Sequence, residues 1–352
     1  MNRFDYIRPT SVAEAVAQAA QPGSAYLAAG TNLLDLMKMG AARPQRLVDI
    51  SRLPGLDRID WLDDGGVRIG ALVRNADLAY DARIQRSFPA VAEALLSGAS
   101  PQIRNAATLG GNLLQRTRCP YFFDTASACN RRAPGSGCDA LQGENRLQAV
   151  LGWSEHCIAT HPSDVCVPLV GLDAVVELEG SNGPREVSLE ALHRLPGSAP
   201  ERETVLAPGE LIVAVRLPSV GAELAPHARY LKVRERTSYA FAVVSAFAAL
   251  DLHDGTIRTA RVALGGVAAK PWRARAAETA LEGAPASSAT FTRAAELALA
   301  EARPSGDNAF KIALARRLIV RALRDALAGT PDGLPALPAS PFAPPKGAHH
   351  AA

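Results

Sequence analysis

The chain has 352 residues, of which 48 % are hydrophobic and 21 % are charged, as in a globular protein of two or three domains. Its formal net charge of +3 is too small to indicate nucleic acid as the main partner, and no apolar run of 18 residues is present to span a membrane. The opening residues MNRFDYIRPTS lack a secretory leader and a twin-arginine start. We therefore expect a cytoplasmic protein, or a periplasmic one if a partner subunit carries the folded chain there.

Residues 1–55 have a pattern of alternating helices and strands. Ser11 and Glu14 match a capping box ahead of VAEAVAQAA, which predicts the start of a helix. SAYLAA then predicts a strand, LLDLMKMG a helix that ends at Gly40, and RLVDI a second strand. This order is typical of a βαβ unit.

Residues 56–222 form a second predicted region. VRIGALV, LDAVVELEG and LIVAVRLP predict strands, and PAVAEALLSGA predicts a helix. The stretch LPGSAPERETVLAPG, rich in Pro and Gly, predicts a surface connection.

Residues 223–330 form a third region with a different character. HARYLKVR, AFAVVSAFAALDL and TARVALGGV predict strands, and HDGT between the last two predicts a hairpin turn. Helices are predicted at 274–283, 290–302 and 308–327, the last with Ile312, Ala315, Ile319, Leu323 and Leu327 on one apolar face. The tail 331–352 is rich in Pro and Ala, and we expect it to be disordered or extended against a partner.

All five cysteines fall in one part of the second region, between Cys119 and Cys166. Most of them lie in a polar loop that is punctuated by Pro and Gly and has no periodic apolar pattern, so a metal held by thiolates would supply the free energy that orders it. Disulfides, unrelated buried thiols and zinc are alternatives, and the gaps of nine, eight and eighteen residues between the first four cysteines do not decide among them. Only Cys166, in the apolar run VCVPLVGL, is well explained as a core thiol.

Two loops that contain glycine carry a second chemical signal. The first, AAGTNLL at 28–34, lies between a predicted strand and a predicted helix, where small residues and free N–H groups suit a phosphate ligand. The alternative is that Thr31 or Asn32 only caps the helix. The second, NAATLGGNL at 105–113, lies just before Cys119 and is not the dinucleotide fingerprint G-x-G-x-x-G. Together the loops suggest a diphosphate ligand beside a metal cluster.

These motifs carry a resemblance to a known family. YLAAGTNLLDLMK, RNAATLGGNLLQRTRCPYFFD and CIATHPSDVCVPL resemble the FAD-binding subunit of molybdenum hydroxylases, the xanthine dehydrogenase and aldehyde oxidoreductase family. The cysteine insertion at 115–160 is similar to the branch whose flavin subunit carries an extra [4Fe–4S] cluster. The resemblance implies an α+β fold. Its first part is a two-part α/β FAD-binding domain of the vanillyl-alcohol-oxidase (PCMH) type. A C-terminal α+β domain with an antiparallel sheet and helices follows it.

The resemblance also implies roles for individual residues. Cys119, Cys129, Cys138 and Cys157 match the four cluster ligands, whereas Cys166 and His161 match structural positions. No catalytic acid, base or nucleophile is implied on this chain. The residues that match FAD contacts are Leu27, Ala28, Ala29, Gly30, Thr31, Asn32, Leu33, Leu34, Thr108, Gly111, Asn112, Arg118, Asp164, Ile212 and Lys232.

By resemblance the chain is an electron-transfer subunit in a heterotrimer. A molybdenum-cofactor subunit would oxidise an aldehyde or heterocycle, a [2Fe–2S] subunit would pass the electrons on, and FAD here would deliver them to an external acceptor. The [4Fe–4S] cluster would be a side reservoir or structural. Alternatives are the flavin subunit of a xanthine dehydrogenase or of an aromatic acyl-CoA reductase, and a zinc-stapled nucleotide-binding scaffold without redox activity.

Overall fold

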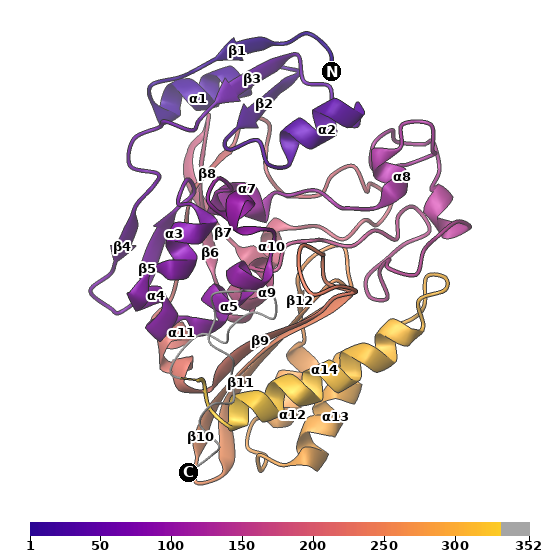
Figure 1. The fold of residues 1–352 in the computed structure, drawn as a ribbon. Helices are drawn as coiled ribbons and strands as arrows, with labels where there is room; N and C mark the ends of the chain where they lie inside the picture. The colour runs from indigo at the N-terminus through magenta and orange to yellow at the C-terminus, as the bar shows by residue number, and fades with distance from the viewer. Residues whose placement is uncertain (332–352) are drawn as a thin grey trace.

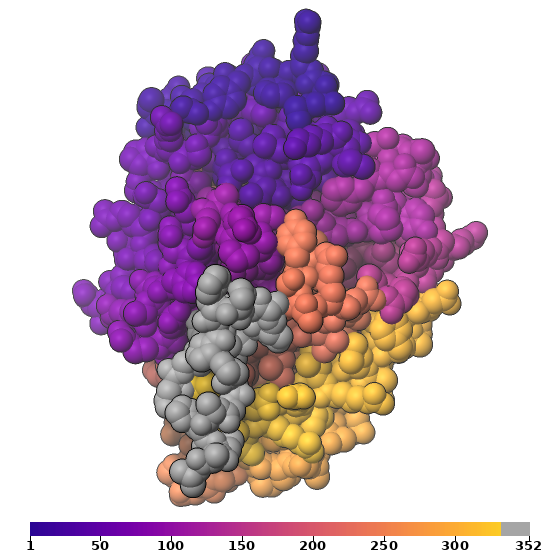
Figure 2. Space-filling model, viewed as in Figure 1, coloured from indigo at the N-terminus to yellow at the C-terminus, as the bar shows by residue number. Residues whose placement is uncertain are grey.

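The computed structural model describes residues 1–331. The rest of the predicted tail, residues 332–352, lies outside the described residues. Within the described part, the chain folds around three sheets (Figure 1), and each sheet takes its strands from one of the three predicted regions. The first sheet is parallel and the other two are antiparallel. The predicted α+β fold is confirmed. In Figure 2 the indigo, purple-to-magenta and orange-to-yellow parts pack directly against one another.

The first sheet has the order β1-β3-β2, in which β2 and β3 are the parallel strands of the predicted βαβ unit. Ser11 caps the first helix by accepting a hydrogen bond from the Glu14 N–H, but the Glu14 carboxylate bonds the Thr10 N–H instead of closing the capping box on Ser11. Gly40 ends the second helix at a φ of +76°, as predicted. The elements are β1 (Asp5–Ile7), α1 (Val12–Ala19), β2 (Ser24–Leu27), α2 (Leu33–Met39) and β3 (Arg46–Asp49).

The second sheet has the order β4-β5-β8-β6-β7, with helices packed against the large core that it shares with the third sheet. Its strands are β4 (Ile59–Trp61), β5 (Val67–Gly70), β6 (Val175–Gly180), β7 (Gly183–Ser188) and β8 (Leu211–Leu217). Its helices are α3 (Asn75–Tyr80), α4 (Ala82–Ser87), α5 (Pro89–Ser97), α6 (Pro101–Arg104), α7 (Leu109–Leu113), α9 (Cys166–Gly171), α10 (Leu189–Leu192) and α11 (Val220–Glu223).

The third sheet has the order β9-β10-β11-β12, and helices α12 to α14 cover one of its faces (Figure 1). Asp254 and Gly255 form the predicted hairpin turn, both with positive φ. On α14, Ala315, Ile319 and Leu323 are buried, so the predicted apolar face packs on the sheet. The elements are β9 (Ala228–Val233), β10 (Val244–His253), β11 (Thr256–Gly265), β12 (Trp272–Arg273), α12 (Arg275–Leu281), α13 (Ser288–Ala298) and α14 (Phe310–Leu327).

The cysteine loop, residues 115–160, projects beside the second sheet and contains only the short helices α8 (Pro120–Phe123) and η1 (Asp139–Leu141) (Figure 1). Its backbone is held largely by local bonds. The guanidinium of Arg132, for example, donates to the carbonyls of Tyr121 and Phe122 at 2.7 and 2.8 Å. Among the described residues, no helix combines the length and the apolar character needed to cross a membrane.

Candidate functional site

A cavity of about 520 Å³ opens where loops of all three regions meet. This volume is in the range of small-molecule and cofactor sites. The cavity is lined by the loop before α2, the loop before α7, the start of the cysteine loop and the segment between β9 and β10. Seven of the residues predicted to contact FAD line it together, and so does the predicted cluster ligand Cys119; the seven are Thr31, Asn32, Gly111, Asn112, Arg118, Asp164 and Lys232.

The first glycine loop does not cap α2 with the Asn32 side chain, which has another role. Asn32 is the N-cap residue of α2, yet its side chain makes no capping hydrogen bond. Its Oδ1 instead accepts from the Arg116 N–H at 3.0 Å, and its Nδ2 is buried without a partner in the described part of the chain. Gly30 has a φ of +73°, and a Cβ there would lie 2.7 Å from the Leu34 side chain, so only glycine fits this turn. The loop therefore holds a free amide donor at the cavity.

The second loop provides part of the cavity lining and one capping residue. Thr108 caps α7 by accepting a weak hydrogen bond from the Gly111 N–H at 3.4 Å. A Cβ at Gly111 would meet only the Thr108 hydroxyl within 4 Å, so a longer side chain at this position would extend into the cavity. Asn112 is held by Gln115 and Ser163, which both donate to its Oδ1, at 2.5 and 2.8 Å.

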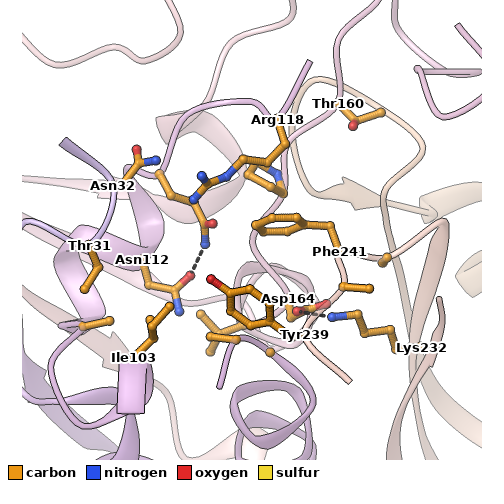
Figure 3. Close-up of a pocket in the computed structure, with 18 of the residues that line it drawn as sticks. Thr31, Asn32, Ile103, Asn112, Arg118, Thr160, Asp164, Lys232, Tyr239 and Phe241 are labelled. Atoms are coloured by element: carbon orange, nitrogen blue, oxygen red, sulfur yellow. Dashed lines mark hydrogen bonds and ion pairs between the residues drawn. The ribbon is translucent and has the colours of Figure 1, made fainter. Parts of the chain in front are cut away.

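Arg118 is one of the cations that line the cavity without a counter-ion in the described chain. It lines the cavity over the ring of Phe241, 4.8 Å from the ring centroid, and it forms no ion pair within 4.0 Å among the described residues (Figure 3). Its Nε is buried without a hydrogen-bond partner there. Burial lowers the pKa of Arg118, because desolvation penalises the charged form. A half-buried guanidinium in this state is suited to an anionic ligand.

At the opposite side of the cavity, Asp164 and Lys232 form a buried pair (Figure 3). Lys232 donates to Asp164 Oδ2 at 2.8 Å and to the Ser97 carbonyl at 3.1 Å. The Tyr230 hydroxyl donates to the other carboxylate oxygen at 2.6 Å. Burial and the carboxylate raise the pKa of Tyr230 well above its usual value, so the phenol stays protonated. These contacts give Asp164 and Lys232 fixed positions toward a ligand.

The structure does not bring every predicted contact to the cavity. The side chains of Leu27, Ala28, Leu33, Leu34 and Thr108 are outside its lining, as are Ala29 and Gly30. Ile212 is buried in the core of the second sheet, beside Leu178 of β6, and also does not line the cavity. Its predicted contact with the flavin stays a prediction.

The cavity also contains residues that the sequence analysis missed. Arg104, at the end of α6, is buried, donates to the Gly98 carbonyl at 2.7 Å and keeps an unpartnered Nε. Its place directly before the second glycine loop was an available signal. Tyr239 and Phe241 line the cavity from the segment between β9 and β10, where Tyr239 has a positive φ of 50°. Exposed aromatic residues in a loop were the signal there.

The first four cysteines converge on a second, small pocket inside the cysteine loop. All are free thiols, and Cys119, Cys129 and Cys157 are buried. The pocket is lined as well by Phe122, Ala140 and Ala159, which belong to the local apolar cluster. Cys119 lines both this pocket and the large cavity, so the two sites share a wall.

Backbone amides surround two of these sulfurs. The backbone amides of Tyr121 and Phe122 act on the Cys119 sulfur, and those of Ala140, Leu141 and Ile158 on the Cys138 sulfur, and they lower the pKa of each thiol. Burial outweighs these amides: it raises the pKa of Cys119 to about 11 and raises that of Cys138, so both are protonated thiols at neutral pH unless a metal is bound. Amide donors around thiolates are a feature of iron–sulfur sites.

Within the described residues, three ligand-type atoms come within 4.8 Å of one another at His161, Cys166 and His193, and not among the other four cysteines. Both imidazoles approach the Leu113 carbonyl, at 3.4 and 2.9 Å, and burial lowers the pKa of both. Burial raises the pKa of Cys166 to about 12. The imidazoles of His161 and His193 approach one carbonyl beside the Cys166 thiol, and the structural roles expected for His161 and Cys166 stay predictions.

Two family models match consecutive parts of the chain. Residues 2–220 match the FAD binding domain in molybdopterin dehydrogenase, and residues 229–326 match the CO dehydrogenase flavoprotein C-terminal domain. The boundary between the two matches falls between β8 and β9, where the second sheet ends and the third begins.

Curated relatives and solved structures agree with these matches. The chain is 51 % identical over 331 residues to the aldehyde oxidoreductase FAD-binding subunit PaoB of Escherichia coli (strain K12), covering 93 % of this chain and 99 % of that one. It is 29 % identical to the carbon monoxide dehydrogenase medium chain of Hydrogenophaga pseudoflava, covering 93 % and 98 %. A solved structure of that dehydrogenase superposes with a TM-score of 0.73 at 29 % identity, covering 93 % of this chain and 98 % of that one.

Proposed function

The chain belongs to the family of FAD-binding domains in molybdopterin dehydrogenases, and we propose that it is the FAD- and [4Fe–4S]-carrying electron-transfer subunit of a molybdenum-dependent aldehyde oxidoreductase. Its named relatives are subunits of oxidoreductase complexes. The observation that carries the proposal is the shared wall at Cys119, which joins a cavity with unpaired donors to a pocket of four free thiols.

The residues of the large cavity suit FAD. Asn32 Nδ2 and Arg118 Nε are buried donors without partners in the described chain, and both belong to residues that line a cavity that Gly111 leaves open. A pyrophosphate would satisfy both donors and supply the missing counter-charge. Asp164 and Lys232, on the other side, offer fixed polar groups to the remaining parts of the cofactor.

The cysteine pocket suits a [4Fe–4S] cluster better than a single zinc ion. Tetrahedral zinc with Zn–S distances of about 2.3 Å brings its sulfurs to roughly 3.8 Å from one another. No three of the four thiols lie within 4.8 Å of one another in the described chain. A cubane cluster holds its thiolates farther apart, because each one binds a different iron. Cys119, Cys129, Cys138 and Cys157 would be the ligands.

When bound, FAD supplies two-electron and the cluster one-electron redox chemistry. The chain's own residues bind, orient and shield the two groups, and we assign none of them a role as a catalytic acid or base. The partners we propose are a [2Fe–2S] subunit and a molybdenum-cofactor subunit in a 1:1:1 complex. The chain on its own is then expected to have no aldehyde oxidation activity but to transfer electrons from an artificial donor to an acceptor.

Spectroscopy with metal analysis of the purified chain tests the proposal. We expect absorption between about 350 and 500 nm from flavin and iron–sulfur, with FAD, iron and acid-labile sulfide released on denaturation. Zinc without visible absorption would overturn it in favour of a zinc-stapled scaffold. Co-expression with neighbouring iron–sulfur and molybdenum subunits should give one complex on gel filtration. Aldehyde turnover by the isolated chain would refute the electron-transfer role.

A further inference from the structure

Arg131 is a buried cation in the wall of the cysteine pocket. Its side chain is 5 % exposed, and its guanidinium lies against the Cys157 sulfur, with which it interacts favourably. One terminal nitrogen pairs with the Glu203 carboxylate at 2.8 Å. The Nε is buried without a partner among the described residues. Arg131 therefore has an unpartnered donor, and it lines the same pocket as the four thiols.

Glu203 holds this arginine from outside the cysteine loop. It belongs to the connection between α10 and β8, which the sequence pattern presented only as a surface link. Its backbone is fixed there, because its carbonyl accepts from the Arg194 N–H at 2.9 Å and the next residue, Thr204, forms a β-bridge with His193. The carboxylate thus reaches the pocket from an ordered segment.

The same carboxylate binds a second arginine, Arg116, which also contacts a residue that lines the large cavity. Arg116 donates its Nε to Glu203 at 2.6 Å, and its guanidinium lies 4.5 Å from the centroid of the Phe122 ring. Its backbone N–H donates to Asn32 in the first glycine loop at 3.0 Å. One chain of contacts, Asn32–Arg116–Glu203–Arg131–Cys157, therefore runs from the proposed FAD site to the proposed cluster.

We propose that Arg131 is a positioning residue that donates a hydrogen bond from its free Nε to a sulfur of the cluster and raises the cluster's reduction potential, while Glu203 holds the guanidinium and moderates its charge. The proposal rests on the proposed function, in which the four cysteines bind [4Fe–4S]. Reduction adds one electron and one negative charge to the cluster. A nearby cation and a donated hydrogen bond stabilise the more negative state, and hence favour reduction.

Two variants of the same ion pair test this inference, because they change the charge beside the cluster in opposite directions. In Arg131→Gln the cation is lost, so the potential should fall. In Glu203→Gln the anion is lost and Arg131 remains, so the potential should rise. The full-length chain is titrated with dithionite, which supplies the electron, and the reduced cluster is followed by electron paramagnetic resonance. We expect a change of at least tenfold in the ratio of reduced to oxidised cluster for each, equivalent to 59 mV for one electron.

Two controls separate this role from a merely structural one. Arg131→Lys keeps the charge but loses the planar fork, and its potential should lie between those of the wild type and Arg131→Gln. Arg146→Gln removes a cation from an exposed ion pair with Glu235 and should leave the potential unchanged. Iron and sulfide contents are measured for every variant.

The outcomes distinguish the two levels of the argument. Shifts in the same direction for Arg131→Gln and Glu203→Gln, or no shift, would overturn the inference while leaving the cluster in place. If Arg131→Gln loses its iron, the reduction potentials of Glu203→Gln and Arg131→Lys are compared with that of the wild type instead. A potential of Glu203→Gln equal to the wild-type value is then sufficient to overturn the inference. A wild-type chain without iron would instead overturn the proposed function.

Discussion

The large cavity and the cysteine pocket share the wall at Cys119, but they are built in different ways. The cavity lies between segments that all three sheets anchor, and its glycine turn, caps and ion pairs are formed by the protein alone. The pocket lies in residues 115–160, where the regular structure is limited to two short helices, the thiols of Cys119 and Cys138 are protonated, and Cys119 is buried and Cys138 half-buried.

The large cavity is therefore formed before its ligand binds, whereas the cysteine pocket depends on its ligand for part of its order. The scaffold holds the cavity open with or without FAD, because periodic elements with buried cores support it. The cysteine loop has a small apolar cluster, so metal binding would supply part of the free energy that orders it. Loss of the cluster should therefore cost local structure, whereas loss of FAD should cost only occupancy.

The largest expected effect is at the cluster ligands. Replacing Cys119, Cys129, Cys138 or Cys157 singly by Ser should abolish the iron content and make residues 117–147 sensitive to proteolysis, with FAD still bound. Iron and sulfide assays and limited proteolysis measure this. The matched control is Cys166→Ser, which should keep its iron, because this thiol belongs to the core of α9. A Cys166 variant that loses iron while one of the other four keeps it would break the assignment.

Gly111→Val should reduce FAD occupancy and leave the cluster intact. The valine side chain would extend into the cavity and displace charge-assisted hydrogen bonds, each worth about 1.5–3 kcal/mol, or roughly 10- to 100-fold in affinity. Flavin fluorescence after denaturation measures the occupancy. Gly30→Val should lose FAD too, but with lower thermal stability, because its φ is +73°. Full flavin retention in Gly111→Val would show that the second loop does not contact the cofactor.

Arg118→Met should weaken FAD binding by roughly tenfold and should not destabilise the FAD-free chain. The reason is that this half-buried cation has no ion-pair partner in the described chain, so its removal costs the apo protein no salt bridge. FAD titration and thermal unfolding test the two halves of the prediction. Arg132→Met is the control, since Arg132 binds loop carbonyls: it should lower stability and leave the FAD affinity unchanged. The reverse pattern would assign Arg118 to the fold.

The smallest effect is expected at Ile212, which the resemblance assigns to the flavin and the structure buries in the core. Ile212→Val should cost about 0.5–1.5 kcal/mol in the free energy of unfolding and leave the flavin absorption maxima in place. Denaturant titration and the visible spectrum report both quantities. A shifted spectrum at unchanged stability would instead support the flavin contact.

Much of the fold was predictable because its periodic segments carry strong local signals. The strand at VRIGALV, the helix that ends at Gly40 and the hairpin turn at Asp254 and Gly255 were all readable from spacing and turn chemistry. The short strand β1 was missed, because three residues carry too little pattern. The capping-box prediction was correct for Ser11, which accepts from the Glu14 N–H. It was wrong for Glu14, because the Glu14 carboxylate accepts from the Thr10 N–H.

The sequence by itself determined the three regions, the clustering of the cysteines and the two glycine loops, since each depends on residues that are neighbours in the chain. Only the tertiary structure decided that Arg118 and Asn32 keep unpartnered donors in one cavity, and that Ile212 is excluded from it. It also decided that Glu203, some seventy residues from Arg131 along the chain, pairs with that arginine beside the cysteine pocket. Pairing and desolvation depend on distances between remote segments, and these are set by how the three sheets pack, which no local pattern encodes.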